Sequence, residues 1–115
     1  MSDQAFHHYY TEEARRDLAR LMAHWLGSRE FWQNKAIQAL GVLRNQHYSG
    51  HPIEGSRSGA LCLHFTVSDR VYTLSYCVEY IVDESEHLCL VSLVETEANF
   101  ARRTQDRQLD RFEDY

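Results

Sequence analysis

The sequence has little of what linkers, leader peptides and membrane spans require. It contains one proline and five glycines among 115 residues, which excludes a long Pro-rich or Gly-rich linker. No apolar run approaches the roughly 20 residues of a membrane-spanning helix. The first residues, MSDQAFHHYY, lack the basic and apolar regions of a signal peptide. These absences predict one cytoplasmic domain, long enough to bury a single hydrophobic core.

Lysine is almost absent as well. Lys35 is the only lysine among 12 basic residues, and 17 acidic residues bring the net charge to −5. An acidic chain is poorly suited to broad, non-specific binding of nucleic acid, which depends on neutralising phosphates. Arginine does suit the recognition of phosphates and carboxylates, so a local arginine patch stays open. A genomic base composition that enriches arginine over lysine is the alternative explanation.

The cysteines limit the redox and metal chemistry that the sequence predicts. Cys62, Cys77 and Cys89 are odd in number and form no CxxC pair, which argues against a disulfide framework and a zinc knuckle. All three lie in predicted strands, so small buried thiols are favoured over a catalytic thiol. The adjacent His7 and His8 would point to opposite faces of a strand, which is poor geometry for one metal ion. We expect no metal site and no cofactor.

The first half of the chain predicts a short strand followed by two helices. Residues 5–10 are rich in aromatic side chains and are assigned to the strand. Thr11 is a good N-cap for an amphipathic helix over 11–26, in which apolar residues recur at steps of three and four. Ser28 caps a second helix almost at once, which predicts an antiparallel helical hairpin. Residues 44–59 carry glycines and the proline and are predicted to form a loop.

Alternating apolar and polar residues in the second half predict a three-stranded antiparallel meander. Its strands are expected at 59–69, 70–83 and 87–97. In the last strand, one face is predicted to carry Leu88, Leu90, Ser92 and Val94, and the other to carry Cys89, Val91 and Leu93. The hairpin should pack on the sheet in one core that contains Leu18, Leu21, Trp25, Leu40, Leu74, Tyr76 and Leu90.

Several stretches resemble the RelE/ParE superfamily of small toxins. These are FHHYYTEEARRDLARL, HPIEGSRSGALCLHF, DRVYTLSY and LCLVSLVETE, which lie within residues 5–100, and the most specific match is Arg70-Val71-Tyr72. The resemblance implies an α+β domain over 1–100 in the order β-α-α-β-β-β. The sheet would be antiparallel or mixed and have about four strands, with the helical hairpin on one face. Residues 101–115 would form a charged C-terminal helix or tail.

The resemblance also implies candidate catalytic residues. A ribonuclease of this fold needs cations at the scissile phosphate, a general base and a general acid, and Arg70, Arg57 and His64 are the candidates. Arg70 could instead be a strand-edge arginine paired with an acid, and His64 a hydrogen-bonded boundary residue. Many ribonuclease members have basic residues with His or Tyr at the end of the last strand, whereas this chain has ETEANF over 95–100. The acidic strand end argues against cleavage.

The function implied by these observations is that of a toxin-like component of a toxin–antitoxin pair. A ParE-like mode, which binds a protein target such as DNA gyrase, is favoured over a metal-independent ribonuclease that cuts messenger RNA on the ribosome. The alternatives are a non-enzymatic interaction protein of phage or plasmid origin and a small-ligand domain. The expected partner is an antitoxin, and its charged contacts are expected at Arg15, Arg16, Arg20, Arg102, Arg103 and Arg107.

Overall fold

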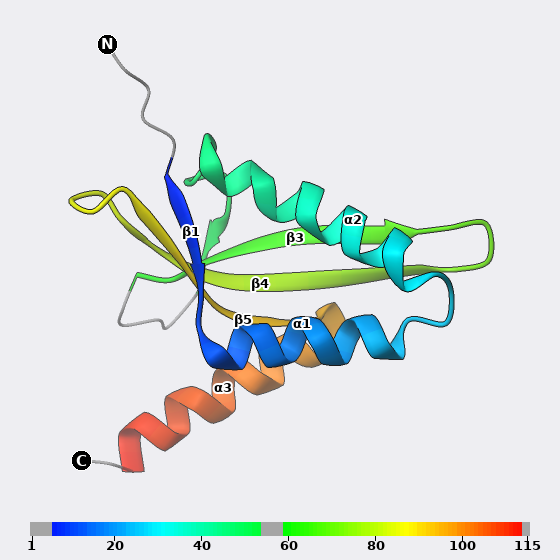
Figure 1. The fold of residues 1–115 in the computed structure, drawn as a ribbon. Helices are drawn as coiled ribbons and strands as arrows, with labels where there is room; N and C mark the ends of the chain where they lie inside the picture. Colours follow the sequence, from blue (N-terminus) through cyan, green and yellow to red (C-terminus); the bar gives the residue numbers. More distant parts are fainter. Residues whose placement is uncertain (1–5, 54–58, 114–115) are drawn as a thin grey trace.

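The computed structural model describes residues 6–53 and 59–113, with side chains described as far as 105. The order of elements is β1 (His7–Tyr10), α1 (Glu12–His24), α2 (Arg29–Gly41), the 3₁₀ helix η1 (Val42–Arg44), β2 (His51–Pro52), β3 (Leu61–Ser68), β4 (Thr73–Asp83), β5 (Leu88–Thr96) and α3 (Glu97–Glu113). Figure 1 shows α1 and α2 joined by a short connection beside one mixed sheet. The predicted α+β class and helical hairpin are confirmed, and no helix among the described residues could cross a membrane.

Both helices of the hairpin begin where their capping residues predict. The Thr11 hydroxyl accepts a hydrogen bond from the Ala14 N–H at 3.1 Å, and the Ser28 hydroxyl accepts one from the Phe31 N–H at 3.3 Å. Such caps satisfy backbone donors that the first helical turn leaves without partners. The hydroxyl of Thr11 also donates to the Ser92 carbonyl at 3.3 Å, so the start of α1 is attached to β5.

The sheet has five strands in the order β1-β5-β4-β3-β2, rather than the predicted four or so. β3, β4 and β5 form the predicted antiparallel meander, and β1 pairs with β5 in parallel. The additional strand, β2, is only two residues long and pairs with β3 from within the region predicted to be a loop. Strand β1 reaches only Val91 of β5, so the second half of β5 lies beyond the end of its neighbour.

Helices cover both faces of the sheet. The hairpin packs on one face over the main core, which includes Leu21, Trp25, Leu40 and Tyr76 as predicted, with Leu18 packed against it. On the other face, Phe100 of α3 packs with Cys62, Cys77 and Leu93. The C-terminal segment is therefore a helix that contributes to a second, smaller core.

A β-bulge in β5 overturns the strict alternation predicted for that strand. Tyr80 pairs with Val91 whereas Glu79 pairs with Leu93, so Ser92 has no residue opposite it. The Ser92 hydroxyl instead donates to the Glu79 carboxylate at 2.6 Å. The extra residue reverses the faces that follow, because side chains alternate strictly only along a regular strand.

Two residues of the predicted core are placed differently in the structure. Cys89, Val91 and Val94 all belong to the core under the hairpin. Leu90 therefore points by alternation to the opposite face. Leu74 is 38% exposed, near the start of β4.

Candidate functional site

Arg70 lies in the turn between β3 and β4, not in the strand that the sequence predicts it to open. Strand β4 begins at Thr73, and Arg70 is exposed. The Asp69 carboxylate shapes the turn by accepting hydrogen bonds from the Val71 N–H at 2.7 Å and the Tyr72 N–H at 3.0 Å. An aspartate that bonds backbone groups two and three residues later is a common way to stabilise a turn.

Tyr72, the last residue of the Arg70-Val71-Tyr72 match, has a structural role. Its hydroxyl accepts hydrogen bonds from the backbone N–H groups of Leu26 and Gly27 in the connection between α1 and α2. Its ring packs on Trp25 with 4.3 Å between centroids. Gly27 is required by close packing, since a Cβ there would lie 2.8 Å from the Trp25 Nε1 atom. Tyr72 therefore joins the sheet to the helical hairpin.

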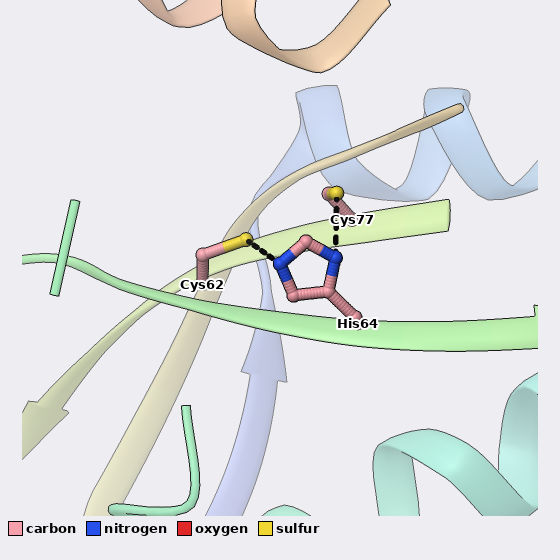
Figure 2. A group of neighbouring side chains, drawn as sticks. All are labelled: Cys62, His64 and Cys77. Atoms are coloured by element: carbon pink, nitrogen blue, oxygen red, sulfur yellow. Dashed lines mark hydrogen bonds between the residues drawn. The ribbon is translucent and has the colours of Figure 1, made fainter. Parts of the chain in front are cut away.

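His64 lies on the sheet face opposite the hairpin, between two cysteines. Figure 2 shows its ring reaching toward both thiols, with Nε2 3.6 Å from the Cys62 Sγ atom and Nδ1 3.2 Å from the Cys77 Sγ atom. We call these three residues the thiol–histidine cluster. Burial raises the pKa of Cys77 to about 12 and also raises the pKa of Cys62. Neither thiol is activated as a nucleophile, because nucleophilic attack requires the thiolate.

The end of β5 holds a largely buried group of two carboxylates and two arginines, here called the β5-end cluster. It comprises Asp17, Arg20, Glu95 and Arg103. Arg103 donates to Asp17 at 2.9 Å and to Glu95 at 3.1 Å, and Arg20 donates to Glu95 at 3.0 Å. The carboxylates are 5% and 4% exposed, so the arginines neutralise charges that water cannot reach.

The β5-end cluster forms where the sheet edge lacks a neighbouring strand. Beyond the end of β1, the Val94 N–H donates to the Asp17 carboxylate at 3.1 Å, and the Val94 carbonyl accepts from Arg103 at 3.5 Å. Side chains from α1 and α3 thus satisfy backbone groups that a longer β1 would have paired. The cluster protects the strand edge and connects both helices to it.

The pKa of Glu95 reflects a balance of opposed effects. Burial raises the pKa, but the Thr96 N–H at 2.8 Å and the two arginines lower it more strongly, and the net pKa lies below its usual value. Glu95 is therefore ionised and fully engaged at neutral pH. It is not placed as a general base for a substrate.

The remaining predicted site residues are spread over the molecule. Arg57 lies outside the described residues, and Arg107 lies in α3 with its side chain outside them. Arg16 forms an exposed ion pair with Glu12 at 2.6 Å. Arg15 and Arg102 are exposed and form no ion pair with any side chain that the structure describes. Of the six arginines predicted to contact a partner, Arg20 and Arg103 are held by the β5-end cluster.

An open groove of about 550 Å³ lies between the two helices of the hairpin. Its residues come from β1, α1, α2 and η1, and most are apolar, including Leu18, Met22, Trp32 and Ile37. Ile37 is 60% exposed, so apolar surface reaches solvent here. Arg44 lines one end, and Arg15 lies one helical turn before the lining residue Ala19 on the same side of α1.

Structural comparison finds the fold that the sequence resemblance implies. No protein-family model matches the chain, and no match was found among curated proteins. The chain is similar to one in the toxin–antitoxin complex RelBE2 from Mycobacterium tuberculosis, with 18% identity and a TM-score of 0.53 over 81% of this chain and 99% of that chain. A chain of the intact E. coli RelBE toxin–antitoxin complex matches with 21% identity and a TM-score of 0.40, over 78% and 94% of the respective chains. The predicted resemblance to RelE-type toxins is confirmed at the level of the fold.

Sequence reasoning missed both polar clusters. A signal for the thiol–histidine cluster was present, because Cys62 and His64 are two apart in one strand and so share a face. The pairing of His64 with Cys77 depends on the register between strands, which the sequence did not specify. Asp17 is a charged residue of an amphipathic helix, a type that local pattern places at the surface, and its burial accompanies its bond to the Val94 N–H beyond the end of β1.

Proposed function

We propose that the chain is the toxin-like component of a toxin–antitoxin pair and that it acts by binding a protein target. The RelE-type fold supports the first part of this proposal, and the geometry of the candidate catalytic residues supports the second. A ParE-like toxin of this kind requires a binding surface but no catalytic residues. DNA gyrase and the ribosome are the two targets that the fold suggests.

The observation that carries the proposal is the separation of Arg70 from His64. His64 pairs with Cys77 in the middle of the sheet, whereas Arg70 lies beyond the end of β3 at Ser68. Four residues of strand separate His64 from Ser68 and span about 13 Å at 3.3 Å per residue. A phosphate stabilised by Arg70 would therefore be far from any proton transfer at His64, although cleavage requires both at one phosphate.

The end of β5 also argues against cleavage. The two arginines nearest to it, Arg20 and Arg103, are both engaged with buried carboxylates. Releasing either one for a phosphate would remove part of the charge that compensates the buried carboxylates, at a cost of several kcal/mol. Beside His64, the Cys62 thiol is close enough to the carboxylates Glu79 and Glu97 for them to contribute to its raised pKa, and these charges would repel a phosphate.

The groove between α1 and α2 is the surface proposed for the antitoxin. We assign to it an amphipathic helical segment that carries carboxylates beside its apolar face. Apolar side chains line the groove, and Arg44 and Arg15 lie at its edges, which is the arrangement that an apolar helix with flanking acidic residues would match. An antitoxin bound here would leave the β5-end cluster intact.

Expression in bacteria tests the proposal. Induction of the chain alone should slow growth, and co-expression of the protein encoded by a neighbouring gene should restore it. Ala19→Glu, which places a carboxylate in the groove, should reduce binding of that protein. His24→Glu is the matched control, since His24 is an exposed residue of the same helix that does not line the groove and lies on a different side of α1 from Ala19. A chain that is harmless and binds no neighbouring product would favour the interaction-protein alternative.

The mode of action has its own assay. Incubation with ribosomes programmed with messenger RNA should leave the message intact, and Arg70→Ala should not change the effect on growth. Cleavage in the ribosomal A site that is abolished by Arg70→Ala would contradict the target-binding mode. Inhibition of purified gyrase in a supercoiling assay would support the ParE-like form of the proposal.

A further inference from the structure

We propose that Cys62, His64 and Cys77 form a binding site for a thiophilic metal ion, Zn²⁺, on the sheet face opposite the hairpin. The site does not depend on the proposed function. It would connect β3 to β4 beside the start of α3.

Strand register brings the three ligands together. Cys62 and His64 are alternate residues of β3 and share a face, and His64 pairs directly with Cys77 of β4. Their ligand atoms all lie within 4.8 Å of one another. Strand β4 is paired on both sides, with β3 and with β5, and β3 is paired with β4 along its whole length and with β2 at Leu61 and Cys62.

The distances suit tetrahedral coordination. Zinc binds cysteine sulfur at about 2.3 Å and histidine nitrogen at about 2.0–2.1 Å, so neighbouring ligand atoms of a tetrahedral site lie about 3.5–3.8 Å apart. The observed separations are 3.6 Å from Nε2 of His64 to Sγ of Cys62 and 3.2 Å from Nδ1 to Sγ of Cys77, so each sulfur faces a different ring nitrogen (Figure 2). One imidazole nitrogen would coordinate the ion, and a rotation of the exposed His64 side chain supplies the adjustment.

The ligand chemistry selects a soft or borderline cation. Two thiols and an imidazole favour Zn²⁺ or Cu⁺ over Mg²⁺ or Ca²⁺, which prefer oxygen ligands. On binding, each thiol loses its proton to solvent and coordinates as the thiolate. Three protein ligands leave a fourth position, which a water molecule can fill.

A disulfide is the competing use of two nearby cysteines, and the register opposes it. Cys62 pairs with Glu79 and Cys77 pairs with His64, so the two cysteines are diagonal rather than opposite neighbours. Diagonal neighbours across antiparallel strands lie about 7–8 Å apart, at or beyond the limit for a relaxed disulfide.

Metal binding can be measured on the untagged, reduced and metal-free chain. Titration with Zn²⁺ should reach one ion per chain and raise the thermal unfolding midpoint. Co²⁺ should give thiolate-to-cobalt absorption bands typical of tetrahedral sulfur coordination. Cys77→Ser and His64→Gln should each weaken Zn²⁺ binding by about 100-fold or more, because loss of even a residue that only orients a ligand costs 10–100-fold. Cys89→Ser is the matched control and should bind normally, since Cys89 is buried in the other core.

Three outcomes would overturn the proposal. The first is zinc binding that persists unchanged in Cys77→Ser and His64→Gln, which would place the ion elsewhere. The second is a Co²⁺ complex without thiolate bands. The third is an intact disulfide between Cys62 and Cys77 in protein purified without reductant, detected by mass spectrometry. If Cys77→Ser does not fold, zinc binding by His64→Gln still shows whether the ion binds at the thiol–histidine cluster. This variant should fold, because the exposed His64 side chain is not part of a core.

Discussion

Replacing Arg103 with methionine should destabilise the fold far more than the position of Arg103 in a charged C-terminal helix suggests. Methionine keeps the aliphatic length of arginine but removes the guanidinium that bonds Asp17 and Glu95. Arg20, 41% exposed, would be the cation left to these carboxylates within the described part of the chain. The substitution therefore tests whether the β5-end cluster behaves as a buried ionic group.

The expected cost follows from burial. Removing one partner of a buried ion pair typically costs about 3–5 kcal/mol, because a charge is left without compensation. We expect about 3 kcal/mol, at the lower end of that range, since Arg20 still neutralises part of the charge. Urea unfolding should show the midpoint reduced by roughly 1–3 M, given slopes of about 1–3 kcal/mol per M. Arg16→Met, which breaks an exposed pair with Glu12, is the control and should cost less than about 1 kcal/mol.

The pH dependence of the difference in unfolding free energy between the wild type and Arg103→Met supplies a second test. In the wild type the pKa of Glu95 is lowered, so its contribution to stability is complete above its unfolded pKa of about 4.3 and is lost as the pH falls through the lower folded pKa. In Arg103→Met, the loss of this guanidinium should raise the pKa of Glu95 above its wild-type value, because one of the groups that lower it is removed. As the pH falls, protonation of Glu95 then removes its buried charge in the variant, and the variant's loss of stability becomes smaller. The difference in unfolding free energy should be largest near pH 7 and narrow below about pH 5.

Two results would refute this reasoning. A loss of stability no larger than that of Arg16→Met would show that the arginine contributes only surface charge. A large loss that stays constant from pH 7 to pH 4 would assign the effect to packing rather than to the ionisation of Glu95.

Three further predictions follow from the packing and the surface. Leu21→Ala should cost about 2–5 kcal/mol in urea unfolding, because Leu21 is 3% exposed in the core under the hairpin. Tyr72→Phe should cost about 0.5–1.5 kcal/mol by the same measurement, since it removes the hydroxyl that accepts from the Gly27 N–H; an unchanged midpoint would contradict its anchoring role. Reversing Arg15 and Arg44 to glutamate should leave stability nearly unchanged but weaken the antitoxin complex and flatten its salt dependence, as measured by calorimetry at two salt concentrations. An unaltered complex would remove these arginines from the interface.

Local pattern predicted the elements of this fold but not their limits. Caps at Thr11 and Ser28 and apolar periodicity depend on neighbours within one helical turn, so the helices could be predicted from the sequence. The start of β4 could not be predicted, because the Asp69 carboxylate accepts a hydrogen bond from the backbone of Val71 and holds the residues before Thr73 in a turn. The bulge at Ser92 also involves a side-chain hydrogen bond that local periodicity does not reveal, since the Ser92 hydroxyl bonds Glu79 on the neighbouring strand.

The sequence by itself determined the helical hairpin and the meander, because these follow from periodicity and from short-range capping, and its resemblance to RelE-type toxins implied the α+β class. Tertiary structure decided which charges are free and which side chains meet. Arg103 and Asp17 are 86 residues apart in sequence, and they meet because β1 ends early and leaves an edge of β5 to be covered. Cys77 meets His64 only through the register of two strands. Long-range contacts of this kind depend on how elements are paired in space, which no local pattern specifies.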